Sequence, residues 1–125
     1  RGRFLILDRE PIEALTERLK RQRSPDFIII DSLQYTGMNY KEYKKLKEQF
    51  PNKLFIFVSH ADGEKPKGST AVSVQYDADM KILVQGYRAI CKGRFMPESG
   101  KHYSIWASAE AKYWGLETNE NESQY

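Results

Sequence analysis

Three short runs of apolar residues, separated by two segments with helical spacing, constrain the fold of this chain more than any other feature. The runs are residues 4–7, 27–30 and 54–58, and each is continuous rather than alternating with polar residues. Continuous runs of this length are typical of strands that are covered on both faces of a sheet. Residues 11–22 and 40–50, which lie between the runs, place apolar residues three and four positions apart, as an amphipathic helix does. The order strand, helix, strand, helix, strand predicts a parallel sheet with right-handed crossovers.

The second half of the chain has a different pattern. Residues 59–70 are polar and contain glycine, which predicts a mobile loop, and residues 71–78 favour a short helical or extended piece. A tight turn is expected at Gln85-Gly86. Strands are expected over residues 80–84, 87–91 and 102–107. We therefore expect an α/β fold, with a mostly parallel sheet flanked by helices and an antiparallel C-terminal extension.

Composition places the chain among soluble globular proteins of a reducing compartment. It has 125 residues, of which 40% are hydrophobic and 30% charged, enough for one domain with a core. No apolar run approaches the roughly 20 residues that cross a bilayer, and the start of the chain lacks the plan of a signal peptide. A single cysteine, Cys91, excludes a disulfide framework and a zinc cluster. We expect a cytoplasmic protein with one core over residues 1–116 and a flexible acidic tail over residues 117–125.

Polar side chains follow each of the three predicted parallel strands. Asp8 and Glu10 follow the first, Asp31 and Ser32 the second, and Ser59 and His60 the third. Ligands of open parallel sheets bind beyond the carboxyl ends of the strands, so three polar ends in succession indicate a site. The alternative, that each strand simply stops at a polar residue, stays open at this point.

Residues 63–70, GEKPKGST, have the glycine spacing of a phosphate-binding loop but not its lysine. That loop needs Lys directly after the second glycine, to reach the β- and γ-phosphates. Ser69 occupies that position instead, and Lys65 and Lys67 lie inside the loop. The segment also follows the strand that ends in Asp31, whereas a phosphate-binding loop precedes it. We therefore exclude a Walker A motif at this position.

One family resemblance involves the strand ends alone. Asp8, Asp31 and Ser59 resemble the Mg²⁺-binding acid, the phosphorylated aspartate and the hydroxyl residue of a response-regulator receiver domain. The 23 positions from Asp8 to Asp31 leave room for one helix, whereas the receiver plan has an additional strand and helix there. A receiver-like phosphoacceptor domain is therefore kept as an alternative interpretation.

A second resemblance covers most of the chain, from about residue 3 to about residue 107. FIIIDS followed by a helix, LFIFVSH, a basic loop with glycine, YDADMKILV and AICKGRF occur in the order and spacing of the C-terminal half of a RecA-type ATPase. In this respect the chain is similar to DnaB-like replicative helicases and to RecA-like ATPases of phages and mobile elements. The resemblance implies a partial RecA-like domain whose intact form binds ATP and Mg²⁺ between subunits.

The RecA-like resemblance also implies roles for the strand-end residues. Asp31 matches the Walker B aspartate, which holds Mg²⁺ through water, and Ser32 and Ser59 are expected beside the nucleotide. Ser59-His60 matches a polar pair that senses the γ-phosphate and commonly ends in Gln, so His60 departs from the pattern. The competing interpretation of His60 is a surface residue without a role.

A basic loop matches the part of the family that contacts DNA. Residues 61–70 match the loop that lines the central channel of the hexamer or filament. The resemblance implies that Lys65, Lys67 and Gly68 bind the phosphates of single-stranded DNA. The loop has no aromatic residue, so the binding is expected to be independent of base sequence.

The segment CKGRF, residues 91–95, matches a trans-acting finger that reaches the nucleotide of the adjacent subunit. Lys92 and Arg94 are two positions apart, so on a strand they share one face. A guanidinium is suited to this task because it is permanently charged and binds phosphate oxygens in pairs. The competing interpretation is that both residues merely keep an edge strand soluble.

The chain lacks the Walker A unit, the part of the family that cradles the phosphates. No G-x-x-x-x-G-K-[ST] sequence occurs in it, and Glu10 is on the wrong strand to replace the catalytic glutamate. We therefore expect the chain, which starts at Arg1, to be the trailing part of an ATPase that forms a ring or filament, and to be inactive alone. Loss of the first strand and its helix would expose an apolar sheet edge, so the fragment is expected to dimerise or aggregate unless something covers that edge. The alternative from another class is a non-catalytic DNA-binding or assembly module with a degenerate RecA fold.

Overall fold

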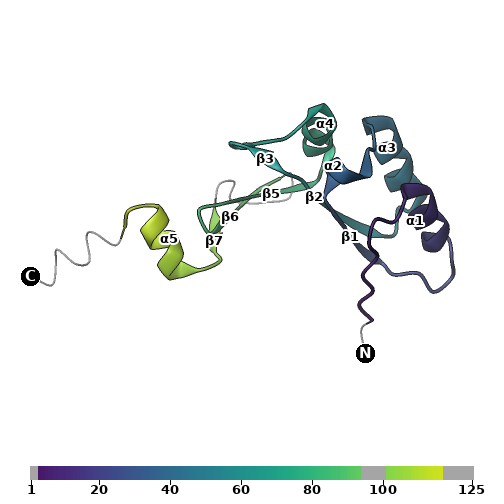
Figure 1. Cartoon of the computed structure of the whole chain (residues 1–125), viewed down its shortest axis with the longest axis horizontal. Helices are drawn as coiled ribbons and strands as arrows, with labels where there is room; N and C mark the ends of the chain where they lie inside the picture. Colours follow the sequence, from purple (N-terminus) through teal and green to yellow (C-terminus); the bar gives the residue numbers. More distant parts are fainter. Residues whose placement is uncertain (1–2, 94–100, 117–125) are drawn as a thin grey trace, which may run out of the picture. The chain divides into compact units, whose positions relative to one another are not determined.

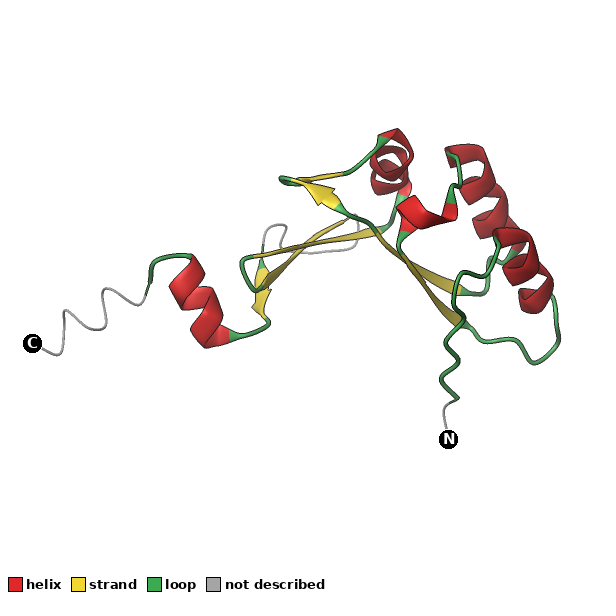
Figure 2. Cartoon of the chain, in the orientation of Figure 1, coloured by secondary structure: helices red, strands yellow, loops and turns green. Residues whose placement is uncertain are grey.

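The computed structural model describes residues 3–93 and 101–116, and the chain divides into two compact units, residues 1–76 and 77–125 (Figure 1). Over the described ranges the fold is mixed α/β, with five helices and three small sheets (Figure 2). One sheet is parallel and two are antiparallel. The expected α/β class is therefore confirmed, but a mostly parallel sheet is not seen within the described residues.

The first unit is built around two parallel strands. Its elements are α1 (Ile12–Leu19), β1 (Phe27–Asp31), α2 (Leu33–Thr36), α3 (Tyr40–Gln49), β2 (Leu54–Val58), β3 (Ala61–Asp62), β4 (Lys65–Pro66) and α4 (Ser69–Asp77). Phe27 of β1 lies opposite Leu54 of β2, and Asp31 lies opposite Val58. The predicted crossover through a helix over residues 40–50 is therefore confirmed, with α3 as that helix.

Local chemistry explains where helices α1 and α3 begin. Pro11 caps α1 in an extended conformation, and its carbonyl accepts a hydrogen bond from the Leu15 amide at 2.9 Å. Asn39 caps α3, where its side-chain oxygen accepts a hydrogen bond from the Glu42 amide at 2.8 Å. Both helices were predicted from their apolar spacing, and both predictions are confirmed.

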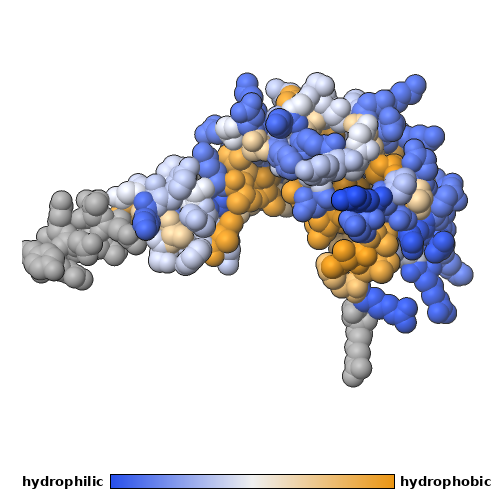
Figure 3. Space-filling view, in the orientation of Figure 1, coloured by the Kyte–Doolittle hydropathy of each residue, from blue (hydrophilic) through white to orange (hydrophobic). Residues whose placement is uncertain are grey.

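The helices cover one face of the β1–β2 sheet and leave the other face exposed. Ile28 and Ile30 are buried, whereas Phe27 and Ile29 on the opposite face are 74% and 60% exposed. The core of the unit comprises Leu19, Ile28, Ile30, Leu33, Met38, Tyr43, Leu46, Ala71 and Val74. The prediction that these strands are covered on both faces is therefore wrong for the described chain. Figure 3 shows apolar surface where the N-terminal segment and this sheet lie.

Residues 4–7 do not form the third parallel strand that their apolar run predicts. The segment has no strand structure, and Phe4, Leu5 and Ile6 are largely exposed. Within the described residues β1 has hydrogen bonds to β2 alone. Hydrophobicity indicates a preference for burial, but a strand also requires a neighbouring backbone with which to pair.

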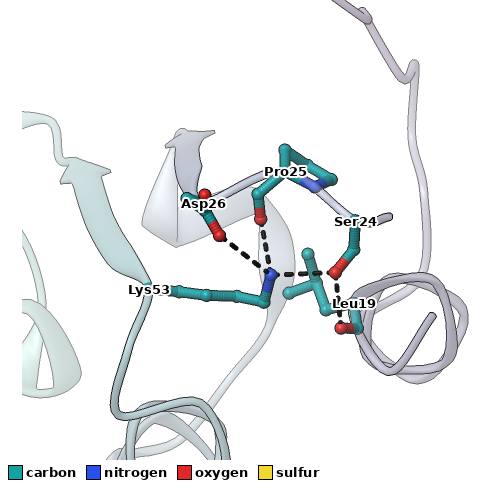
Figure 4. Close-up of polar contacts among 5 residues, drawn as sticks. All are labelled: Leu19, Ser24, Pro25, Asp26 and Lys53. Carbon is teal, nitrogen blue, oxygen red and sulfur yellow. Dashed lines mark hydrogen bonds and ion pairs between the residues drawn. The ribbon is translucent and has the colours of Figure 1, made fainter. Parts of the chain in front are cut away.

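Lys53 joins the two loops that precede β1 and β2 (Figure 4). Its ammonium donates hydrogen bonds to the Pro25 carbonyl at 2.6 Å and to Ser24 Oγ at 2.8 Å, and Ser24 Oγ donates to the Leu19 carbonyl at 2.8 Å. Asp26 lies 3.8 Å away but is well exposed, so it adds little. These bonds fix the amino ends of the parallel strands, opposite to the edge where a ligand would bind.

The second unit contains an antiparallel sheet, as predicted. Its elements are β5 (Met80–Gln85), β6 (Arg88–Gly93), β7 (His102–Ser104) and α5 (Ala107–Tyr113), with strand order β5-β6-β7. Gly86 and Tyr87 both have positive φ, 54° and 62°, which is the geometry of a two-residue hairpin turn. The turn therefore falls one residue later than the predicted Gln85-Gly86.

Helix α5 was not predicted from the sequence. The expected strand over residues 102–107 ends at Ser104, and α5 begins at Ala107. The helix contacts the sheet through Glu110, which pairs with Arg88 and lies 3.4 Å from His102 Nε2. Trp114 donates a hydrogen bond to the Gly86 carbonyl at 3.0 Å.

Close packing at the hairpin turn requires glycine at position 86. A Cβ at this position would lie 2.5 Å from the Tyr113 ring and 2.6 Å from the Trp114 ring, so another side chain fits there only if these rings move. The Arg88 guanidinium also lies over the Trp114 ring, 4.5 Å from its centroid. The contact between α5 and the hairpin therefore has a steric, a hydrogen-bonding and an electrostatic part.

The other face of the β5–β6–β7 sheet is apolar and exposed. Met80, Ile82, Val84 and Tyr103 all have more than half of their surface accessible. Ile82 lies opposite Cys91 and Val84 opposite Ala89, so the face is apolar across the strands. Figure 3 shows this apolar surface over β5 and β6.

We expect Lys53→Met to lower the free energy of unfolding by about 2 kcal/mol, because it removes charge-assisted hydrogen bonds to groups that stay in place. Urea unfolding followed by circular dichroism measures this effect. Lys45→Met on the exposed side of α3 is the matched control and should change stability by less than about 0.5 kcal/mol. Equal effects of the two substitutions would contradict a structural role for Lys53.

We expect the contact between α5 and the sheet to be lost at acid pH. The neighbouring Ser104 hydroxyl and the hydrogen bond from Arg88 lower the pKa of Glu110 below its ordinary value of 4.5, while burial acts in the opposite direction. A lowered pKa stabilises the folded form above pH 4.5, and this stabilisation is lost as the pH falls through the folded-state pKa. Trp114 fluorescence in a Trp106→Phe background should report the transition, and Glu110→Gln should remove it. A Glu110→Gln chain with an unchanged acid transition would contradict this assignment.

Candidate functional site

Asp31 and Ser59 lie at the same end of the parallel β1–β2 sheet, as the sequence predicts. Asp31 is the last residue of β1 and is exposed, and its partner in the register, Val58, directly precedes Ser59. The carboxyl ends of parallel strands are the edge at which open sheets bind ligands. A carboxylate on this edge is held by a strand and stays open to solvent.

Ser32, the second predicted ligand residue, is almost completely buried. Its exposed fraction is 2%, and within the described residues its hydroxyl has no hydrogen-bond partner. Asp31 and Ser32 are joined by a cis peptide bond. Buried hydroxyls without a partner are uncommon and unfavourable. The Ser32 oxygen is closed to solvent whereas Asp31 is exposed, so a ligand at Asp31 could reach this hydroxyl only if neighbouring residues moved.

The oxygen ligands at this edge can hold a magnesium ion only if water or a bound ligand supplies the remaining coordination positions. No cluster of three or more His, Cys, Asp or Glu residues that could hold a metal occurs within the ranges that the structure describes. Mg²⁺ commonly binds one or two carboxylates and completes its octahedron with water and phosphate oxygens. Asp31 therefore fits an ion that arrives with a nucleotide better than an ion held by protein alone.

Gln34, on α2, is a central residue of this edge that sequence analysis missed. Its side-chain nitrogen donates to Ser59 Oγ at 2.7 Å and to the Lys67 carbonyl at 2.8 Å. Its side-chain oxygen accepts a hydrogen bond from the His60 amide at 3.1 Å. The available signal was a polar residue three positions after the acid-tipped strand, which alone does not indicate a contact 33 residues away.

His60 is held by its backbone rather than by its ring. Its carbonyl accepts hydrogen bonds from the Lys67 amide at 2.8 Å and from Ser59 Oγ at 2.9 Å. Its ring packs edge-on against Tyr35, with 5.8 Å between the centroids. His60, the predicted γ-phosphate sensor, follows Ser59 at the carboxyl end of β2, which is the edge where it was expected.

The predicted basic loop is a short hairpin followed directly by a helix. Strands β3 and β4 pair Asp62 with Lys65, and α4 begins at Ser69. Lys65, Lys67 and Gly68 are all exposed. Gly68 has a φ of 97°, and its carbonyl accepts the first helical hydrogen bond of α4, from Val72 at 3.1 Å.

A hollow of about 260 Å³ lies between α2 and the start of α4. It is lined by Leu33, Gln34, Gly37, Met38, Lys67, Gly68, Ser69, Thr70 and Ala71. Two of the three predicted DNA-binding residues, Lys67 and Gly68, therefore border the same hollow as Gln34.

Lys92, a predicted finger residue, lies on β6 in the second unit and is exposed. Its cross-strand neighbour is Lys81 of β5, so two positive charges lie side by side on one face of the sheet. Like charges in this arrangement repel each other, which favours a bound anion. Arg94, the other predicted finger residue, lies outside the described residues.

The acids near residue 10 lie on the segment before α1, outside the two parallel strands. Glu10 pairs with Arg18 at 2.6 Å, and Asp8 is exposed in a bend. The receiver interpretation and the RecA-like interpretation both expect a larger parallel sheet than the two strands that the structure describes. The size of this sheet therefore does not favour either interpretation.

Comparison with known proteins gives no relative from which function can be inferred. The chain matches no model of a protein family, no curated protein and no solved structure. Within the described ranges, no helix has the length and apolar character needed to cross a membrane. Function must therefore be argued from the geometry of the strand edge.

We expect Mg²⁺ to bind weakly at Asp31, at concentrations of about 10 mM, because one carboxylate supplies few of its six ligands. Amide chemical shifts of residues 31 and 32, followed by NMR during a MgCl₂ titration, measure this binding. Asp31→Asn should abolish the shifts, and Asp8→Asn should leave them unchanged. Loss of the shifts in Asp8→Asn would instead favour the receiver interpretation, in which both acids hold the ion.

Proposed function

We propose that this chain is part of a RecA-like ATPase domain from a helicase- or recombinase-type protein that acts on single-stranded DNA during replication or recombination. In the intact protein, ATP and Mg²⁺ bind between subunits, with Asp31 on one side and Lys92 and Arg94 of the next subunit on the other. The isolated chain is inactive, because its sequence contains no phosphate-cradling loop. The observation that carries the proposal is an exposed acid, Asp31, at the carboxyl edge of a parallel sheet.

The polar groups at this edge suit a magnesium–nucleotide complex. Asp31 supplies an exposed carboxylate, and Ser32, whose hydroxyl has no hydrogen-bond partner among the described groups, lies buried next to it in the chain. Ser59 and His60 follow the neighbouring strand and face the same end of the sheet. A hydrated Mg²⁺ would offer a partner to the exposed Asp31 carboxylate, whereas the Ser59 hydroxyl already donates to the His60 carbonyl and would have to exchange that bond for one to a phosphate.

The β3–β4 hairpin supports binding of nucleic-acid phosphates. Lys65, Lys67 and Gly68 are exposed, and Gly68 lets a phosphate approach the backbone closely. Asp62 and Glu64 lie in the same hairpin, so its net charge is close to neutral. Binding should therefore be weak, sensitive to salt and independent of base sequence.

A homo-oligomer is the assembly that the proposal requires. Lys92 lies beside Lys81 on an exposed strand, which suits a phosphate supplied by a neighbouring subunit. The exposed apolar faces of the β1–β2 sheet and of the β5–β6–β7 sheet also favour assembly, because such faces are usually covered. A dimer is the expected state of the isolated chain.

A non-catalytic assembly or DNA-binding module with the same fold is the second candidate. It is favoured by the lack of a G-x-x-x-x-G-K-[ST] sequence together with the two exposed apolar faces. This candidate shares the DNA-binding hairpin but needs no ion at Asp31. Absence of any Mg²⁺-dependent shift at residues 31 and 32 would favour this candidate.

We expect the double substitution Lys65→Ala and Lys67→Ala to weaken binding of a fluorescent oligo-dT about tenfold. Fluorescence anisotropy at several salt concentrations measures both the affinity and its salt dependence. Removal of two phosphate contacts should lower the slope of log affinity against log salt by about 1.4.

The matched control for this experiment is Lys41→Ala with Lys45→Ala, two exposed residues of α3. It removes the same charge from the same unit and should change the affinity less than about twofold. Equal losses in both double variants would show a general charge effect and would overturn the hairpin assignment.

A further inference from the structure

We propose that Gln34 is a positioning residue for nucleic-acid binding: its side-chain amide fixes the base of the β3–β4 hairpin and so presents Lys65 and Lys67 to phosphates. This inference rests on the proposed DNA binding and names the residue on which that binding depends. Gln34 itself is three residues beyond Asp31, on the one-turn helix α2. It was not among the residues that the sequence singled out.

The Gln34 side-chain amide makes three hydrogen bonds, to Ser59, His60 and Lys67. It donates to Ser59 Oγ, just after β2, at 2.7 Å and to the Lys67 carbonyl, just after β4, at 2.8 Å. It accepts from the His60 amide, just before β3, at 3.1 Å. One side chain therefore holds both ends of the hairpin to the helix that follows β1.

The hairpin needs such support because its own pairing is short. Strands β3 and β4 have two residues each, and the closing hydrogen bond runs from the Lys67 amide to the His60 carbonyl at 2.8 Å. A hairpin of this length is not stable by itself in water. Without the Gln34 amide, the hairpin would be held together by that single hydrogen bond and by the two residue pairs of β3 and β4.

Only a glutamine can make this set of contacts. The amide offers donors and an acceptor at once, at the end of a side chain long enough to reach the hairpin. Glutamate keeps the acceptor for His60 but loses both donors and places a charge beside the Lys67 carbonyl. Leucine keeps the size and loses all three hydrogen bonds.

A fixed hairpin binds phosphates more tightly than a mobile one, because less conformational entropy is lost on binding. The lysines themselves are unchanged when Gln34 is replaced, so the number of phosphate contacts is unchanged too. A positioning role therefore predicts weaker binding with the same salt dependence. Removal of a lysine predicts weaker binding with a smaller salt dependence.

The test compares the wild-type chain with Gln34→Leu, Gln34→Glu and the control Gln49→Leu, an exposed residue at the end of α3. Amide hydrogen exchange by NMR reports the hairpin, and anisotropy with oligo-dT reports binding. In Gln34→Leu, protection of the residue 60 and 67 amides should fall at least tenfold, while the residue 28 and 30 amides of β1 stay protected. The affinity should fall about fivefold with an unchanged salt slope.

Gln34→Glu should separate the two halves of the contact. The residue 60 amide should stay protected, because the carboxylate still accepts its hydrogen bond. The residue 67 amide should lose protection indirectly, because the Lys67 carbonyl loses its donor and the hairpin end is released from its bond to the His60 carbonyl. DNA binding should be as weak as in Gln34→Leu. Gln49→Leu should behave as the wild type in both measurements.

Two results overturn the inference and differ from each other. Unchanged exchange or unchanged affinity in Gln34→Leu, with a wild type that binds DNA, removes the role of Gln34 and leaves the proposed function in place. A wild-type chain that does not bind oligo-dT, although its residue 60 and 67 amides are protected, removes the proposed DNA binding itself.

Discussion

The parallel register of β1 and β2 is the constraint on which the rest of the first unit depends. It places Asp31 opposite Val58, so that the residues after both strands emerge together at one edge. A slip of one residue would turn Ile28 and Ile30 outward and Phe27 and Ile29 toward the helices. The same slip would also turn Asp31 toward the core, where its charge has no partner. Burial of two isoleucines and exposure of one carboxylate therefore specify the same register.

Much of this framework follows from the sequence, for identifiable reasons. Helices α1 and α3 are marked by apolar spacing and by Pro11 and Asn39 at their starts, which are local signals. Strands β1 and β2 are marked by their apolar runs, and their pairing follows from the helix between them. The position of Asp31 and Ser59 at one edge then follows from the parallel direction alone. Local pattern and a single topological rule thus predict this part of the site.

The features that the sequence did not predict depend on contacts between distant residues. Residues 4–7 have the composition of a strand, but composition does not show whether a pairing partner exists. Helix α5 depends on Glu110 meeting Arg88 and on Trp114 reaching Gly86, which lie 22 and 28 residues apart in the chain. Gln34 contacts Lys67 over 33 residues. A hydrogen bond over such distances leaves no periodic signal in one sequence, so the polar network of the edge is visible only in three dimensions.

The exposed face of the β1–β2 sheet and the candidate ligand edge are physically linked. Asp31 belongs to the same face as Phe27 and Ile29, since alternate residues of a strand point the same way. A subunit that covers these apolar side chains would therefore border Asp31 and remove water from around its carboxylate. Desolvation makes an unpaired charge unfavourable, and a bound cation offsets that cost. Assembly over this face would thus strengthen the attraction of Asp31 for Mg²⁺, which is the coupling expected of a nucleotide bound between subunits.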